Sequence, residues 1–89
     1  MGLNFPNPSR TFDEARRLIR FWGYDSAIEI SFFLDATALQ KITPQMGGAE
    51  ADILKVFDSA REQIHGIANK VYFRGPKGAY ACDLVAEDF

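Results

Sequence analysis

The longest helical pattern of apolar and polar residues in this chain of 89 residues runs from Gly48 to Gly75. Its apolar side chains recur three or four residues apart, so they form one stripe along an α-helix. The stripe consists of Ile53, Val56, Phe57, Ala60, Ile64, Ile67, Ala68 and Val71. The pattern predicts one long amphipathic helix that lies with this stripe on a sheet.

The length of this helix is a problem for so small a chain. At about 1.5 Å of rise per residue, residues 49–74 would span roughly 39 Å, whereas a domain of this size is about 31 Å across. The helix must therefore bend, fray, overhang or pack on a partner. Gly66 lies on its polar face, where packing does not explain a glycine, and we expect it to mark a bend or the point where the helix leaves the sheet. Gly75 is expected to end the helix in a left-handed conformation.

Two shorter stretches, residues 16–22 and 27–34, alternate apolar and polar side chains with a period of two, which is typical of strands. Residues 23–26 between them have the composition of a turn. A hairpin closed by these four residues would place Phe21 opposite Ile28, and Arg20 opposite Glu29 as a favourable pair of opposite charges.

Turn residues, a helix cap and a further alternation predict the structure of the remaining residues. Residues 1–11 are rich in proline and asparagine and predict an extended lead-in that Phe5 and Phe12 attach to the body. Asp35 is placed to cap a short helix over residues 36–42. Residues 80–85 alternate again and predict a last strand.

These elements, in the order ββααβ, predict an α+β fold. We expect a two-layer sandwich in which one short and one long helix cover a small, mainly antiparallel sheet. At 89 residues the chain predicts a single domain, residues 1–89, with one modest core.

Composition narrows the class of protein. The chain is 47% hydrophobic and 25% charged, without an apolar run long enough to span a membrane and without a signal-peptide pattern at its start. We therefore expect a cytoplasmic protein with no membrane partner. The net charge of −2 supplies no general field for nucleic acid.

Four blocks of the sequence are similar to those of a known family. They are LNFPNPSR at the start, RFWGYDSAIEISFFL in the hairpin, FDSAREQIHGIANKVY in the long helix and the closing pair Asp88-Phe89. Together they resemble the small bacterial family named domain of unknown function fourteen eighty-eight. The resemblance implies a compact α+β domain that occurs as a stand-alone bacterial protein, and it implies no activity and no catalytic residues.

The residues that could carry chemistry do not form a recognisable motif. His65 is the only histidine and Cys82 the only cysteine, and their spacing matches neither a zinc site nor a nucleophile with its base. The segment 75–78 contains glycine and lysine but follows a helix, which is the reverse of a phosphate-binding loop. We expect no metal, no cofactor and no catalytic residue. An enzyme with a cleft around His65 is the weakest alternative.

Two surfaces are candidates for binding a partner. On the long helix, one line beside the apolar stripe combines apolar, cationic and aromatic groups, unless the short helix or the lead-in covers it. On the outer face of the hairpin, arginines accompany aromatic side chains, unless the lead-in or a second subunit covers them. The first surface consists of Leu54, Arg61, His65 and Tyr72, and the second of Arg16, Leu18, Arg20, Trp22, Tyr24 and Phe33.

From these surfaces we expect a non-catalytic interaction module that forms a homodimer or binds an unknown protein partner. The long helix and the apolar outer face of the hairpin are the two reasons for self-association. The alternative is an accessory protein that binds nucleic acid through the arginine-rich first strand. It would use Arg10, Arg16, Arg17 and Arg20 together with Trp22.

Overall fold

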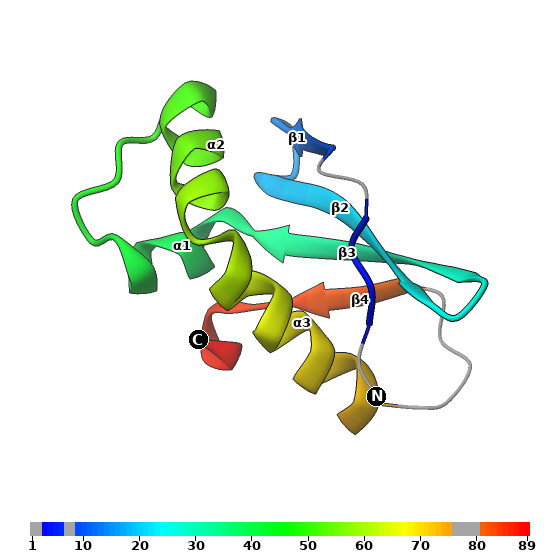
Figure 1. Ribbon diagram of the computed structural model, residues 1–89. Coiled ribbons are helices and arrows are strands. Elements are labelled where there is room, and N and C mark those ends of the chain that lie inside the picture. Colours follow the sequence, from blue (N-terminus) through cyan, green and yellow to red (C-terminus); the bar gives the residue numbers. More distant parts are fainter. Residues whose placement is uncertain (1–2, 7–8, 76–80) are drawn as a thin grey trace.

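The computed structural model describes residues 3–6, 9–75 and 81–89 (Figure 1). Helices cover one face of a four-stranded sheet whose strands lie in the order β1-β2-β3-β4. Neighbouring strands are antiparallel except β3 and β4, which are parallel. The elements are β1 (Arg10–Asp13), β2 (Leu18–Asp25), β3 (Ile28–Asp35), α1 (Ala36–Ile42), α2 (Glu50–Ser59), α3 (Arg61–Arg74), β4 (Ala81–Leu84) and the 3-10 helix η1 (Ala86–Asp88).

The predicted α+β class is confirmed, with one strand and one helix more than expected. The additional strand β1 begins at the end of the predicted lead-in and pairs with β2. The predicted last strand starts within residues 76–80, outside the described residues, and its described part is β4.

The core lies between the sheet and the helices, as the alternation and the helical stripe predict. Because successive strand residues point to opposite faces, every second residue of β2 and β3 is buried. The largest fully buried side chains are Ile19, Phe21, Ile30, Phe32, Leu34, Leu39, Ile53, Phe57, Ile64 and Leu84.

The predicted pairing within the hairpin is wrong by four residues. Phe21 lies opposite Phe32 and Arg20 opposite Phe33, because β2 continues to Asp25 and a two-residue turn follows it. The first turn residue, Ser26, has a φ of 57°, which permits so tight a reversal. A shift by an even number of residues leaves each side chain on its predicted face, so the core prediction survives the error.

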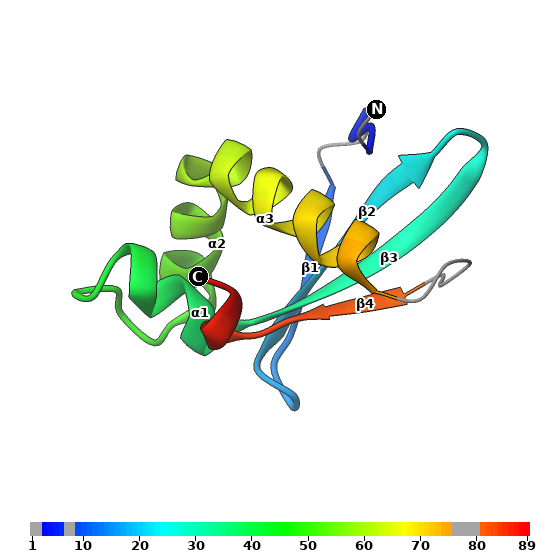
Figure 2. The ribbon, with the colours of Figure 1, turned by 90° about the horizontal axis from the view of Figure 1, so that it is seen from below.

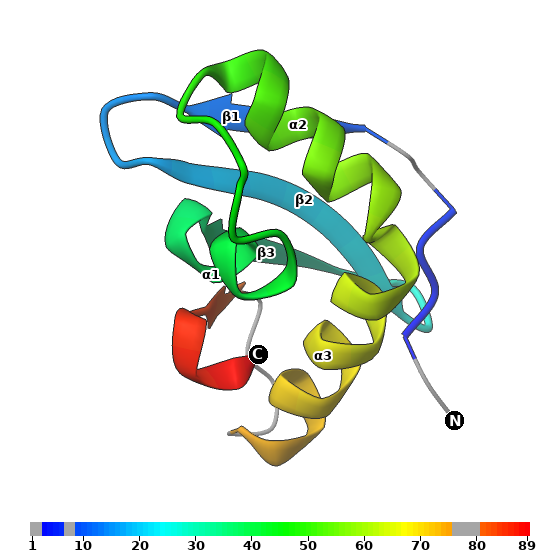
Figure 3. The same ribbon diagram turned by 90° about the vertical axis from the view of Figure 1, so that its left-hand side faces the viewer.

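The predicted long helix is divided at Ala60 and not at Gly66. Ala60 has φ −106° and ψ 17°, and its N–H donates to the carbonyl oxygens of both Val56 and Phe57 at 3.0 and 3.2 Å. The bend lets the buried faces of α2 and α3 both follow the twisted sheet (Figure 3). The longest dimension of the molecule is consequently 35 Å, and a partner is not needed to cover an overhanging helix.

The predicted ends of the helices are mostly confirmed. Asp35 caps α1 by accepting a hydrogen bond from the N–H of Thr37 at 3.0 Å, and α1 has the predicted bounds. Gly75 ends α3 in an extended conformation, φ −82° and ψ −174°, so the left-handed prediction is wrong. Phe73, in the last turn, is 51% exposed and touches the ring of Tyr72 edge-on at 4.9 Å.

Candidate functional site

Helices α2 and α3 lie on one side of the sheet, and the opposite face is turned away from them (Figure 2). This face carries the outer hairpin residues that the sequence singled out, except Arg16. We call it the open face. Strand alternation places on it the residues that flank the buried ones. The open face consists of Thr11 and Asp13 from β1, Leu18, Arg20, Trp22 and Tyr24 from β2, Glu29, Ser31, Phe33 and Asp35 from β3, and Ala81 and Asp83 from β4.

Two rows of paired residues cross the open face from β2 to β4. In the first row, Arg20 pairs with Phe33, and Phe33 pairs with Asp83. A cation, a half-buried aromatic ring and an anion therefore follow one another across the sheet. The second row runs from Trp22 through Ser31 to Ala81, so a large aromatic side chain stands at one end and a methyl group at the other.

The charges of the first row are not neutralised within the described part of the chain. The guanidinium of Arg20 lies over the Trp22 ring, 5.1 Å from its centroid, and makes one long hydrogen bond of 3.4 Å to the Ser31 hydroxyl. Neither Arg20 nor Asp83 forms an ion pair with a described residue. Adjacent strands lie about 4.8 Å apart, so Phe33 separates the backbones of the two charged residues by roughly 10 Å.

The remaining predicted residues of this face lie beside the rows. Arg16 belongs to the turn that precedes β2 rather than to the strand, and its guanidinium lies 3.9 Å from the Asp13 carboxylate. Tyr24 donates its hydroxyl hydrogen to Glu29 at 3.3 Å. A hollow of about 440 Å³ opens at the end of the face, next to Arg16, Leu18 and Phe33.

The predicted surface on the long helix lies on the other side of the sheet and is largely covered. The lead-in runs beside α3 (Figure 3), and the Phe5 ring stacks on His65 with 3.9 Å between centroids. Burial lowers the pKa of His65, and the positive charge of Arg61 lowers it further. Tyr72 is buried and its hydroxyl donates to Asp25 at 2.7 Å. The two predicted surfaces therefore do not combine into one site.

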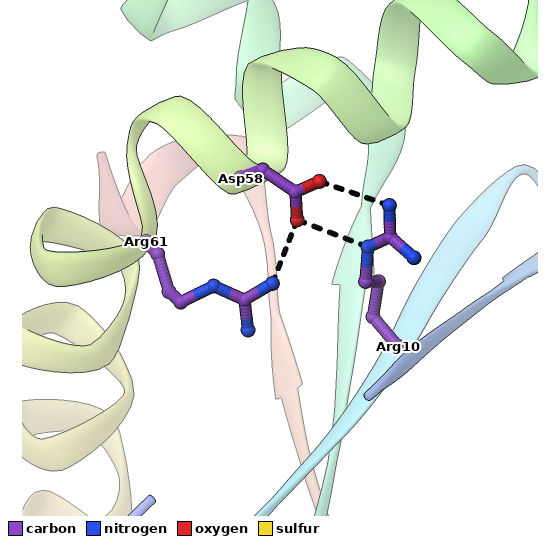
Figure 4. A network of polar contacts seen from close by, with 3 residues as sticks. All are labelled: Arg10, Asp58 and Arg61. Carbon is purple, nitrogen blue, oxygen red and sulfur yellow. Dashed lines mark hydrogen bonds and ion pairs between the residues drawn. The ribbon is translucent and has the colours of Figure 1, made fainter. Parts of the chain in front are cut away.

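Arg61 takes part in a cluster that the sequence analysis missed (Figure 4). The Asp58 carboxylate accepts hydrogen bonds from Arg61 at 2.6 Å and from Arg10 at 3.0 and 2.9 Å. The three-residue spacing of Asp58 and Arg61 on a helix is visible in the sequence, but the approach of Arg10 from β1 is not. The cluster ties the edge strand to the bend between α2 and α3.

The charges of this cluster change the acidity of Asp58. Partial burial raises the pKa of its carboxyl, but the hydrogen bonds and positive charges of Arg10 and Arg61 together hold that pKa below the ordinary value of 3.8. A carboxyl whose pKa is lowered by folding stabilises the folded state above its ordinary pKa, and this contribution is lost as the pH falls through the lowered pKa.

We expect Asp58→Asn to lower the free energy of unfolding at pH 7 by about 1 kcal/mol or less, because the carboxylate is 43% exposed and solvent screens the pairs. The difference from wild type should disappear as the pH falls below 3.8, which urea titrations at several pH values measure. Glu14→Gln is the control, because this exposed carboxylate has no ion pair with a described residue. An effect of Asp58→Asn that persists at low pH would contradict the assignment.

In the part of the chain that the structure describes, neither His65 nor Cys82 belongs to a metal-binding cluster. Among residues 3–6, 9–75 and 81–89, no group of three or more His, Cys, Asp or Glu side chains could hold a metal ion. Burial raises the pKa of the Cys82 thiol, and the negative charge of Asp83 raises it further, which disfavours the nucleophilic thiolate. None of the helices in the described part of the chain is long and apolar enough to cross a membrane.

Comparison with known proteins places the chain in a family. The model of the family described as "Protein of unknown function (DUF1488)" matches residues 3–81. A crystal structure of a DUF1488 protein of unknown function from Shewanella loihica PV-4 is similar, with a TM-score of 0.74 and 16% identity over 92% of each chain. At this identity the likeness supports the fold alone, and no curated protein matches the chain. Because the family model covers most of its length, this chain belongs to the DUF1488 family.

Proposed function

We propose that this protein is a non-catalytic interaction module that binds a protein surface through the open face of its sheet. The observation that carries the proposal is the pair of rows across that face. They combine a half-buried aromatic centre, Phe33 and Trp22, with one cation and one anion that form no ion pair in the part of the chain that the structure describes. Aromatic residues and arginine are the side chains enriched in protein interfaces. The partner surface would have an apolar centre flanked by charges of both signs.

The distribution of the arginines gives less support to nucleic-acid binding. Arg10 is held by Asp58 on the helix side of the sheet, and Arg17 donates to the carbonyl oxygen of Gly48 at 3.1 Å. Only Arg16 and Arg20 of the four lie beside the open face. Acidic side chains share this face with them, so it does not present the basic stripe that phosphate groups require.

The proposal is tested by recovering partners from cells that naturally contain the protein. The tagged chain should retain specific proteins, and Phe33→Glu should lose them, because it buries a charge at the centre of the face. We expect binding to fall about 30-fold, which corresponds to an interface residue worth about 2 kcal/mol. Mass spectrometry of the retained proteins, with and without nuclease treatment, is the measurement.

Phe73→Glu is the matched control, because it makes the same substitution at a half-exposed ring on the helix side and should leave the recovery unchanged. Circular dichroism establishes that both variants fold. Equal recovery by Phe33→Glu and wild type would contradict the proposal. Loss of the retained material on nuclease treatment would replace it with the nucleic-acid alternative.

A further inference from the structure

We infer that the partner of the open face is a second copy of this chain, related to the first by a two-fold axis parallel to the strands and centred over Phe33. This inference rests on the proposed function, since it names the occupant of the same face. The rows across the face carry it, because their two ends complement each other.

The two-fold axis fixes which strands meet. An axis that runs along β3, between two sheets packed face to face, leaves each position along the strands unchanged and exchanges the two sides of the sheet. In such a pair, β3 lies over β3, and β2 of each copy lies over β4 of the other. Two stacked sheets with closely aligned strands, about 10 Å apart, are a common packing arrangement.

This pairing would neutralise the two charges that form no ion pair among the described residues. Arg20 stands one strand to one side of Phe33, and Asp83 stands one strand to the other side, in the same row. The axis therefore brings Arg20 of each copy over Asp83 of the other, which forms two symmetric ion pairs. The two Phe33 rings meet at the axis between these pairs, where they shield the charges from water and stack on each other.

The second row is complementary in size. The axis places Trp22 of one copy over Ala81 of the other, because they stand at opposite ends of the row that Ser31 joins. Ala81 is exposed, and its methyl group leaves room for an indole ring from above. A large side chain thus meets a small one on both sides of the axis, as close packing between sheets requires.

A third row accounts for the exposure of the apolar residue Val85. Val85 follows the buried Leu84, is still extended with φ −112° and ψ 169°, and is 41% exposed. Because side chains alternate along the strand, Val85 points to the open face like Asp83, two residues before it. Leu84 pairs with Leu34, so Val85 stands in the same row as Asp35 and Leu18. The two-fold axis directs Val85 of one copy toward Leu18 of the other, where the hollow of about 440 Å³ can receive it.

Two acidic side chains lie near the axis at the ends of the proposed contact. Glu29 and Asp35, at the two ends of β3, would each approach their own symmetry mate. Each is already held within its chain, Glu29 by the Tyr24 hydroxyl and Asp35 by the N–H of Thr37. These hydrogen bonds hold both carboxylates within their own chains, and the like charges at these two points limit the affinity of the dimer.

The area of the open face limits the affinity of the proposed dimer. The molecule measures 35 × 23 × 23 Å, so one face offers little more than the roughly 800 Å² per partner of a standard interface. Only the centre of the face is apolar. We therefore expect a reversible dimer with a dissociation constant near or below about 100 μM.

Charge reversal tests the pairing of Arg20 with Asp83. Sedimentation equilibrium at concentrations around 100 μM should give a monomer–dimer equilibrium for wild type. Arg20→Asp and Asp83→Arg should each weaken it at least about tenfold, because each places like charges opposite each other. The double variant Arg20→Asp/Asp83→Arg should recover the wild-type constant within about threefold, since it restores two opposite-charge pairs.

Two further experiments test the same pairing of the two copies in other ways. An equimolar mixture of the two single variants should form a heterodimer, because each cross-pair then joins opposite charges. If a charge variant fails to fold, Ala81→Trp replaces it, because a second indole leaves no room for Trp22 of the other copy and should abolish the dimer. A two-fold axis perpendicular to β3 would instead bring Arg20 over Arg20 and Asp83 over Asp83 already in wild type, so neither single charge reversal would add a like-charge contact or weaken the dimer tenfold.

The results separate this inference from the proposed function. A monomeric wild type well above 100 μM, single variants that still form dimers, or a double variant that does not recover would each overturn the inference. If wild type is monomeric but Phe33→Glu still loses proteins recovered from cells, the open face binds a different protein and the proposed function stands. If Phe33→Glu changes no recovery, the proposed function fails as well.

Discussion

Replacing Phe21 with alanine is expected to lower the free energy of unfolding by about 3–5 kcal/mol, the effect of a cavity left by a fully buried phenyl ring. Phe21 is the centre of the aromatic core. Its ring stacks on Phe32 at 5.2 Å, meets Phe57 at 5.3 Å and lies 6.1 Å from Phe5. It therefore connects the central strands, α2 and the lead-in.

Urea denaturation at pH 7 measures the loss. A chain of 89 residues has a total stability of roughly 5–13 kcal/mol, so the variant should unfold at a much lower urea concentration or be partly unfolded without urea. Phe73→Ala is the control, because that ring is half exposed at the end of α3 and its removal leaves no cavity. A loss below about 1 kcal/mol for Phe21→Ala would contradict the central role of this ring.

Alternation and capping predicted the parts of the fold that depend on neighbours in the chain. The period of two placed Ile19, Phe21 and Phe32 on the buried face, and the structure buries all three. The carboxylate of Asp35, just before an apolar helical pattern, predicted the start of α1 correctly. These features depend on local geometry, so a single sequence contains the information for them.

Pairings between distant segments were not predictable in the same way. Period-two patterns specify the face of each residue but allow any register that differs by two, so the hairpin could shift by four residues without exposing the core. The position of β4 beside β3 depends on where the chain returns after α3. Without that position, Asp83 and Ala81 could not be assigned to the same rows as Arg20 and Trp22.

The break at Ala60 removes one of the two reasons for which the sequence predicted self-association. The helical pattern is continuous across this residue, and the bend arises because two helices must both lie on a twisted sheet, which no local signal records. An overlong helix no longer calls for a partner. The rows of the open face now support the proposed dimer, and they make the proposal more specific because it names both a symmetry and the residues that would meet.

The lead-in adds to the covering that α2 and α3 give to one side of the sheet. Asn4 forms a bridge with Tyr24 through two backbone hydrogen bonds of 2.9 and 2.7 Å, and the N–H of Leu3 donates to the side-chain oxygen of Asn69 at 2.8 Å. These contacts hold Phe5 over the helix side of the sheet and on His65. No described segment of the chain performs this role on the opposite side, where we propose that a second copy binds.

The Phe5 ring can lie against β2 because position 23 is a glycine. We expect Gly23→Ala to lower the free energy of unfolding by about 1–3 kcal/mol. A Cβ atom at Gly23 would lie 2.5 Å from the Phe5 ring, closer than two carbon atoms can approach. Gly23 is buried and pairs with Ile30 in the ladder, so the strand cannot move away from the ring. The lead-in would have to give way instead.

A double-mutant cycle separates this collision from a general effect of alanine. In a Phe5→Leu background, Gly23→Ala should lower stability by clearly less, because a shorter side chain can withdraw from the added methyl group. Gly66→Ala is the control of opposite sign. That glycine is exposed within α3 with no atom within 4 Å of an added Cβ, so alanine should raise stability by about 0.5–1 kcal/mol. If Gly23→Ala did not lower stability, Phe5 would not lie against β2 where the contacts place it.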